Sequence, residues 1–156
     1  MADLHFLPAT ELARMLAAGE VSSVELLDHF LDRIDRLDGP LNCVVALDAE
    51  RARVQATEAD AARARGESWG RLHGLPMTVK DAFETEGVVT TSGAPELAAH
   101  VPDRDADAVA RLKDAGAVIF GKTNLPLYAG DMQTFNEVYG RTNNPYAPDR
   151  TVGGSS

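Results

Sequence analysis

Cysteine is nearly absent from this sequence, and so are the features that mark secreted and membrane proteins. Cys43 is the only cysteine among the 156 residues, so no disulfide can form within the chain. Its place in an apolar run indicates a small core residue. No apolar stretch approaches the length of a membrane span, and the N-terminus lacks a basic region followed by an apolar one. The sequence therefore predicts a soluble cytoplasmic protein without a signal peptide.

Positive charge is also scarce. The chain has 15 Lys and Arg residues against 24 Asp and Glu residues, which gives a formal net charge of -9. Nucleic-acid phosphates and anionic membrane surfaces attract basic proteins, so this balance argues against both as the main partner. The four histidines are scattered, and none lies at ligand spacing from the acids Glu84 and Glu86. The sequence therefore predicts neither a metal site nor a cofactor.

The composition, 44% hydrophobic and 25% charged, suits a single domain with a substantial core. Apolar spacing and helix stop signals predict an N-terminal helical segment over residues 1–67, in which Ser22 and Glu25 fit a capping box. Alternating helix and strand patterns favour an α/β fold with much of its sheet parallel. The predicted helices cover 10–18, 22–38, 48–65 and 103–115, and the predicted strands cover 41–47, 75–79, 88–91 and 117–120.

A lysine directly follows the mostly apolar strand predicted over residues 75–79. Lys80 shares a strand face with Thr78, and Asp81, the next residue, points to the opposite face. Burying an ammonium without a partner is expensive, so such a lysine either finds an anion or loses its proton. A neutral lysine is a competent general base. The alternative is that Lys80 simply reaches water from the end of the strand.

Residues 116–123, Gly-Ala-Val-Ile-Phe-Gly-Lys-Thr, match the pattern of a phosphate-binding P-loop. That loop needs a strand before its first glycine and a helix after its Ser or Thr, so that amides at the helix start face the phosphates. Here a predicted helix precedes Gly116, and the apolar residues after it are typical of a strand. We therefore interpret Gly116 as the end of a helix and Lys122 as a residue at a strand end.

The last residues of the sequence, Gly153-Gly154-Ser155-Ser156, form a second stretch of interest. Glycines give the backbone unusual freedom and bring amides close to a ligand. Serine hydroxyls on such a loop can carry protons, attack a carbonyl or hold an anion. The alternative is a flexible linker tail. The stretch is typical of the middle of a loop, so we expect an incomplete domain.

Taken in order, five motifs resemble the amidase signature family, serine hydrolases with a Ser-Ser-Lys triad. The resemblance spans about residue 20 to the last residue. It implies helices packed on a central mixed, largely parallel β-sheet, with residues 68–156 as the first part of the α/β core. The motifs are Gly74-Leu75-Pro76-Met77-Thr78-Val79-Lys80-Asp81, Thr90-Thr91-Ser92-Gly93, Gly121-Lys122-Thr123-Asn124-Leu125-Pro126, Tyr139-Gly140-Arg141-Thr142-Asn143-Asn144-Pro145 and Gly153-Gly154-Ser155-Ser156.

The resemblance also implies roles for individual residues. Lys80 matches the family's catalytic lysine, and Ser155 matches the bridging serine, which in the family follows a cis peptide bond. The loop around residues 129–132 lies beside the substrate in the family, which implies that Ala129, Asp131 and Ser155 bind it. Two departures matter: Leu127 stands where many members carry an acid, and the family's nucleophile and oxyanion hole lie farther along than Ser156. We therefore expect the 156-residue polypeptide to be inactive alone.

Three functions follow from these observations. The first is the N-terminal portion of an amidase that hydrolyses a carboxamide to an acid and ammonia or an amine. The second is a noncatalytic binding module. The third is the amidotransferase A subunit that feeds ammonia to misacylated transfer RNA, and we favour a stand-alone amidase because residues 124–129 differ from what that subunit usually shows. The implied partner is a small-molecule amide, with no nucleic acid and no membrane, and a homodimer of the full-length enzyme stays open.

Overall fold

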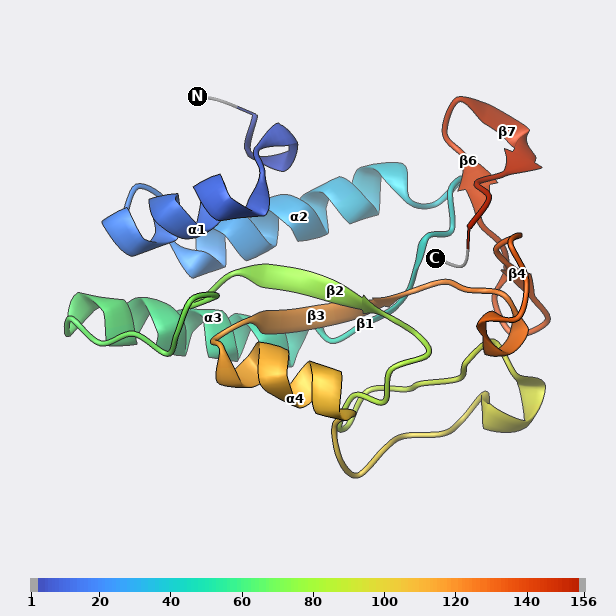
Figure 1. The fold of residues 1–156 in the computed structure, drawn as a ribbon. Helices are drawn as coiled ribbons and strands as arrows, with labels where there is room; N and C mark the ends of the chain where they lie inside the picture. Colours follow the sequence, from blue (N-terminus) through green and yellow to red (C-terminus); the bar gives the residue numbers. More distant parts are fainter. Residues whose placement is uncertain (1–2, 155–156) are drawn as a thin grey trace. The chain divides into compact units, whose positions relative to one another are not determined.

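The computed structural model describes residues 3–154 (Figure 1). Two helices begin the chain, strands of a three-stranded sheet then alternate with further helices, and two two-stranded sheets follow. The α-helices are α1 (Ala9–Ala18), α2 (Ser23–Leu37), α3 (Ala49–Ala64) and α4 (Asp107–Asp114). The strands are β1 (Val44–Leu47), β2 (Pro76–Lys80), β3 (Val118–Thr123), β4 (Phe135–Asn136), β5 (Gly140–Arg141), β6 (Asn143–Asn144) and β7 (Ala147–Thr151).

The first three strands form a mixed sheet in the order β1-β3-β2. β1 and β3 are antiparallel, with Ala46 opposite Lys122. Next to the start of β2 and β3, the Val118 amide donates to the Leu75 carbonyl (2.9 Å), and next to the end of both strands the Asp81 amide donates to the Thr123 carbonyl (3.0 Å). The residue numbers of the bonded partners increase together on the two strands, so the strands are parallel. The α/β prediction with a mixed sheet is therefore confirmed.

Contacts between residues divide the chain into two compact units that interleave in sequence. The first unit holds α1, α3 and most of α2, and the second holds β1 and the loops and short strands that follow β2 and β3. The first comprises Met1–Arg33, Asp48–Met77 and Ala110–Phe120, and the second comprises Ile34–Leu47, Thr78–Val109 and Gly121–Ser156. The sequence-based boundary between residues 67 and 68 stays a prediction.

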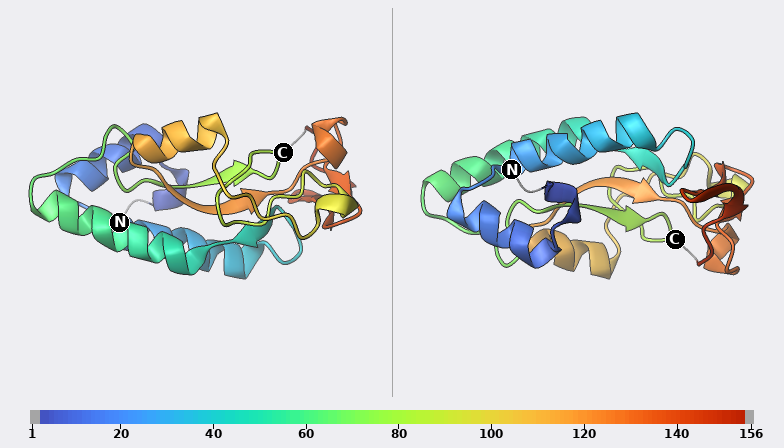
Figure 2. Two further views of the ribbon diagram at one scale, coloured as in Figure 1. Left: turned by 90° about the horizontal axis from the view of Figure 1, so that it is seen from below. Right: turned by 90° about the horizontal axis from the view of Figure 1, so that it is seen from above.

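A cluster of buried aliphatic side chains forms the core of the first unit. Leu12 and Leu16 of α1 pack with Val21, Leu26 and Leu75, and each is at most 7% exposed. The two leucines of α1 are one helical turn apart, so they lie on the same face of the helix. Figures 1 and 2 show α2 and α3 side by side, and a bond of 2.8 Å from the side chain of Arg53 to that of Asp28 joins them. The apolar spacing of the N-terminal sequence thus predicted these helices correctly.

The N-terminus of α2 has two caps. In the first, the Ser22 amide donates to a Glu25 carboxylate oxygen (2.9 Å) and the Glu25 amide donates to Ser22 Oγ (3.1 Å), which confirms the predicted capping box. The bonds that the carboxylate accepts from the Ser22 amide and the Ser22 hydroxyl (2.8 Å) hold the pKa of Glu25 below its ordinary value. In the second, Asp60 of α3 accepts from the amides of Ser23 (2.8 Å) and Val24 (3.1 Å). A carboxylate from a neighbouring helix thus satisfies two amides that the first turn leaves unpaired.

We expect Asp60→Ala to lower the free energy of unfolding by about 1–2 kcal/mol, because two amides at the start of α2 lose their acceptor. Chemical unfolding followed by circular dichroism measures this loss. Glu58→Ala, an exposed change on the same helix, is the control and should leave stability within about 0.5 kcal/mol of the parent. Equal effects of the two substitutions would contradict the role of Asp60 as a cap.

Two sequence predictions in the second unit were wrong. Residues 88–91 do not form a strand, because their amides bond to loop partners: Thr90 donates to the His100 carbonyl (3.0 Å) and Thr91 to the Asp81 carboxylate (3.0 Å). The helix predicted from residue 103 begins at Asp107 instead. Before it, the Ala106 amide donates to the Glu84 carbonyl (2.9 Å). In both places the backbone hydrogen bonds are used by tertiary contacts rather than by regular structure.

Other sequence interpretations can also be checked. α4 precedes Gly116 and residues 118–123 form β3, the reverse of the order that a P-loop needs, so that pattern is a coincidence. Cys43 is half-buried rather than part of the core; burial and the neighbouring Asp38 carboxylate raise its pKa to about 12. Among residues 3–154, no helix is both long and apolar enough to cross a membrane.

Candidate active site

Lys80 is the last residue of β2, at the carboxyl end of a strand that pairs in parallel with β3. Ligands of α/β sheets commonly bind at this end of the strands. The side chain is half-buried, and the next residue, Asp81, is fully buried. The alternation of strand faces predicted that these two neighbours have different surroundings, and their burial agrees with it.

The partner of Asp81 is Lys122, from the neighbouring strand β3. Both side chains are 0% exposed, and Lys122 Nζ lies 3.9 Å from Asp81 Oδ1. The ammonium donates hydrogen bonds to the Phe83 carbonyl, to Thr85 Oγ1 (3.1 Å) and to Thr90 Oγ1 (2.9 Å). The charge of Lys122 is therefore stabilised by three oxygens and, over a longer distance, by one carboxylate.

The carboxylate of Asp81 is bound unevenly. Its Oδ2 accepts from the amide of Thr91 (3.0 Å) and from the hydroxyl of Thr91 (2.6 Å), whereas its buried Oδ1 accepts no hydrogen bond. Burial raises the pKa of Asp81, and the bonds from Thr91 and the charge of Lys122 oppose that rise. Asp81 directly follows Lys80 in sequence, so its buried pairing with Lys122 fixes the backbone from which the candidate base projects.

The predicted substrate-binding loop lines a hollow in the second unit. A cavity of about 610 Å³ is lined by Ala129, Gly130, Asp131, Met132 and Gly154. The hydroxyl of the buried Thr134 donates to the Gly154 carbonyl (2.9 Å), which ties the loop to the glycine pair. Ala129 and Asp131 thus share a cavity with the residue that precedes Ser155. Ser155 itself, and the peptide bond that joins it to Gly154, lie outside the described residues.

The backbone of this loop is strained at two residues that are not glycine. Tyr128 (φ 49°) and Ala129 (φ 56°) both adopt left-handed conformations, each of which costs about 1–3 kcal/mol. Hydrogen bonds hold them there: the Tyr128 amide donates to the Ser92 carbonyl (2.8 Å), and the Tyr128 hydroxyl donates to Glu96. Strained residues of this kind cluster at ligand sites, and the role of this loop in substrate binding stays a prediction.

A second hollow adjoins the loop within the same unit and has a volume of about 490 Å³. Its wall combines apolar side chains with carboxylates and shares Gly130 and Asp131 with the first hollow. The apolar members Leu127, Tyr128 and Phe135 are each about half exposed, and the acidic members are Glu96, Asp131 and Glu137.

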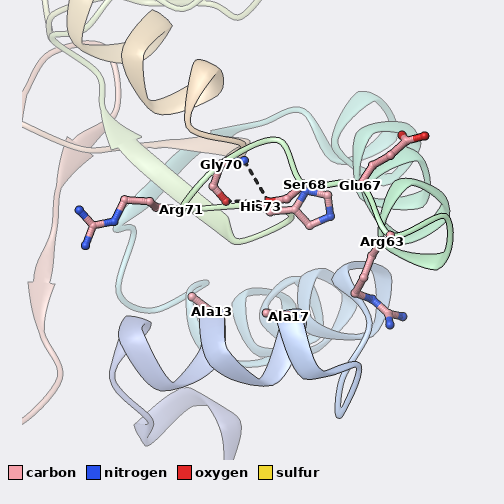
Figure 3. A pocket seen from close by; sticks show the side chains of 9 residues that line it. Ala13, Ala17, Arg63, Glu67, Ser68, Gly70, Arg71 and His73 are labelled. Carbon is pink, nitrogen blue, oxygen red and sulfur yellow. Dashed lines mark hydrogen bonds between the residues drawn. The ribbon is translucent and has the colours of Figure 1, made fainter.

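The first unit contains a separate pocket of about 360 Å³, shown in Figure 3. Arg63 and Arg71 contribute to its lining, but their guanidinium groups point away from one another. His73 bonds at both ring nitrogens, to the Trp69 amide (3.0 Å) and to the Ala59 carbonyl (3.0 Å). Because its polar groups do not converge, this pocket is not a candidate for the active site.

Sequence reasoning missed two features of the site. Thr134 carries no motif, and a lone threonine between Gln133 and Phe135 gives no signal of a buried contact with Gly154. The pairing of Lys122 with Asp81 could have been anticipated from the sequence. Lys122 follows five residues that are typical of a buried strand, and a charged side chain at such a position needs a partner of opposite charge.

Comparison with known sequences gives a consistent result. A protein-family model described as Amidase matches residues 25–156. The glutamyl-tRNA(Gln) amidotransferase A subunit of Thermobifida fusca (strain YX) is 43% identical over 156 residues, which are 100% of this chain and 31% of that protein. The corresponding protein of Moorella thermoacetica, of the same name, is 44% identical over 154 residues, 99% of this chain and 32% of that protein. The chain thus spans about a third of the length of these curated relatives.

Solved structures are similar over nearly the whole chain. A protein from a vestigial complex that reveals the evolutionary origins of an s-triazine catabolic enzyme has a TM-score of 0.89 and 37% identity, covering 96% of this chain and 33% of its own. Fatty acid amide hydrolase has a TM-score of 0.88 and 31% identity, with coverage of 96% and 26%. The peptide amidase of Stenotrophomonas maltophilia has a TM-score of 0.87 and 36% identity, with coverage of 96% and 32%.

Proposed function

Because this chain belongs to the amidase signature family, we propose that it supplies part of the active site of an enzyme that hydrolyses a carboxamide C–N bond. Lys80 is the general base, and Ser155 is the bridging serine between Lys80 and a nucleophilic serine beyond residue 156. The observation that carries the proposal is the cavity that Ala129 and Asp131 share with Gly154, the residue before Ser155. The substrate is a small-molecule amide.

The proposed reaction is a proton relay coupled to acyl transfer. Uncharged Lys80 accepts a proton from the Ser155 hydroxyl, which in turn accepts one from the nucleophilic serine as that serine attacks the amide carbonyl. The C–N bond breaks, and the leaving ammonia or amine receives the proton back through the same two groups. Water then attacks the acyl-enzyme, releases the acid and restores the serine.

Expression of the complete reading frame tests this proposal. We expect the protein translated from it to release ammonia and acid in equal amounts from a simple carboxamide. We expect the 156-residue polypeptide alone to release none, because the relay lacks its nucleophile. Ammonia release by that polypeptide, lost in Lys80→Ala, would contradict the proposed position of the nucleophile. Failure of the complete protein to hydrolyse any of a broad panel of amides would instead favour a noncatalytic binding module.

A second candidate function is the A subunit of a tRNA-dependent amidotransferase. It is favoured by the 43–44% identity to proteins of that name over essentially the whole chain. The two functions differ in how activity depends on partners. A stand-alone amidase hydrolyses simple amides without other subunits, whereas an amidotransferase component uses glutamine and passes ammonia to misacylated transfer RNA. Assays of both reactions, with and without co-expressed partner subunits, separate them.

A further inference from the structure

A buried hydroxyl holds the carbonyl of Gly154, the residue before Ser155. Thr134 is 1% exposed, and its Oγ1 donates to the Gly154 carbonyl at 2.9 Å. Gly154 is the residue directly before the proposed bridging serine, and it lines the same cavity as Ala129 and Asp131. Gly153 (φ 70°) and Gly154 (φ 81°) adopt conformations that other residues rarely reach. The glycines permit this turn of the chain, and the Thr134 hydroxyl holds one carbonyl in it.

Thr134 is itself held by a second buried threonine. The amide of Thr142 donates to the Thr134 carbonyl (3.0 Å), next to the pairing of Phe135 with Arg141 between β4 and β5. The hydroxyl of Thr142, which is 4% exposed, donates to the Asn42 carbonyl (2.7 Å) and accepts from Asn124 Nδ2 (3.0 Å). The position of Thr134 is therefore tied to residues before β1 and after β3.

Two buried asparagines complete the connection to the sheet. Asn124 directly follows β3, and its Oδ1 accepts from Asn136 Nδ2 at 2.7 Å. The same Asn136 nitrogen donates to the Leu125 carbonyl (2.7 Å), and Asn136 Oδ1 accepts from the amides of Val138 (2.9 Å) and Tyr139 (2.7 Å). Both side chains are at most 3% exposed, so these bonds are made away from water. A fully bonded buried network of this kind is rigid and fixes one geometry.

We infer that Thr134 is a positioning residue: by holding the Gly154 carbonyl, its hydroxyl fixes the Gly153-Gly154 turn that leads into the bridging serine of the proposed relay. This inference rests on the proposed function. It predicts a kinetic defect without a loss of substrate binding, because the hydroxyl acts on the bridging serine rather than on the substrate.

The test compares four forms of the protein translated from the complete reading frame. Thr134→Val removes the hydroxyl and keeps the shape, and we expect kcat to fall about 10²-fold with KM changed less than about twofold. Thr134→Ser keeps the hydroxyl and should retain kcat within about threefold of the parent. The matched control is Thr151→Val, since Thr151 Oγ1 is buried without a hydrogen-bond partner and its removal should leave kcat unchanged.

The outcomes separate this inference from the proposed function. Lys80→Ala is measured alongside these forms. If the parent protein has no amidase activity, or if the Lys80→Ala variant keeps that activity, both the proposed function and the inference about Thr134 are refuted. A parent that depends on Lys80 while Thr134→Val keeps its full kcat overturns the inference alone, and so does a Thr134→Ser variant as slow as Thr134→Val. Should Thr134→Val not fold, Thr134→Cys replaces it, because its thiol matches serine in size but is a weaker donor. Equal kcat values for the Ser and Cys variants then overturn the inference.

Discussion

Lys80→Ala is expected to reduce kcat for amide hydrolysis by about 10³-fold or more, because it removes the general base on which the proposed relay depends. KM should change little, since Lys80 acts on Ser155 rather than on the part of the substrate that gives affinity. Stability should also change little, because Lys80 is half-buried at the end of β2 and does not belong to a core cluster. Steady-state kinetics on the protein from the complete reading frame measure the effect, with thermal unfolding as the check on folding.

Two further substitutions separate the role of the base from the role of a positive charge. Lys80→Arg places a permanent cation at this position, because a guanidinium holds its proton at every accessible pH, so this variant should be about as inactive as Lys80→Ala. Lys113→Ala, which removes a half-buried lysine from α4, should leave kcat unchanged. Substantial activity in Lys80→Arg would show that the position needs a cation and would contradict the base mechanism.

The helices were predictable because their signals are local. Apolar residues at helical spacing predicted α1 and α2, and the Ser22–Glu25 capping box placed the start of α2 within one residue. The strands β2 and β3 were also predicted to within three residues at each end, since buried parallel strands are continuous apolar runs bounded by glycine. Each of these elements is determined by residues within a few positions of one another.

The contacts that define the candidate site could not be predicted in this way, because they join residues far apart in sequence. Asp81 and Lys122 are paired across the sheet (3.9 Å), and Thr134 reaches Gly154 through a single hydrogen bond (2.9 Å). The family resemblance identified Lys80 and Ser155, which carry the proposed chemistry. It did not identify the buried residues that hold their backbones, because a threonine or lysine acquires such a role only when the fold supplies its partner.

The buried pair beside Lys80 illustrates how such a role depends on context. Asp81 and Lys122 are both fully buried, and removing one partner of such a pair typically costs about 3–5 kcal/mol because the other charge is left uncompensated. Removing both at once costs less, since no buried charge remains. The net contribution of the pair to the free energy of unfolding is therefore smaller than the Coulomb attraction between its two charges, because both charges were removed from water. Its role is to specify one arrangement of β2, β3 and the loop after Lys80.

Lys122→Met is accordingly expected to lower the free energy of unfolding by about 3–5 kcal/mol near neutral pH, the largest stability effect of any single change proposed for this chain. The loss should shrink in acid. Burial already raises the pKa of Asp81 above its ordinary value of 3.8, and loss of the Lys122 charge, which opposes that rise, raises it further. Protonation of the Asp81 carboxyl therefore stabilises the folded variant fully below pH 3.8. This contribution is lost as the pH rises through the pKa that Asp81 has in the folded state.

Urea unfolding of the parent, Lys122→Met, Asp81→Asn and the double variant, each at about pH 7 and about pH 4, measures both effects. The double variant should be more stable than the sum of the single losses predicts, because the two side chains interact directly. Lys113→Met, on α4, is the control for loss of a lysine and should cost less than about 1 kcal/mol at either pH. A stability loss in Lys122→Met that is the same at both pH values would mean that the Asp81 charge does not cause it, and strictly additive losses would mean that the two side chains act independently.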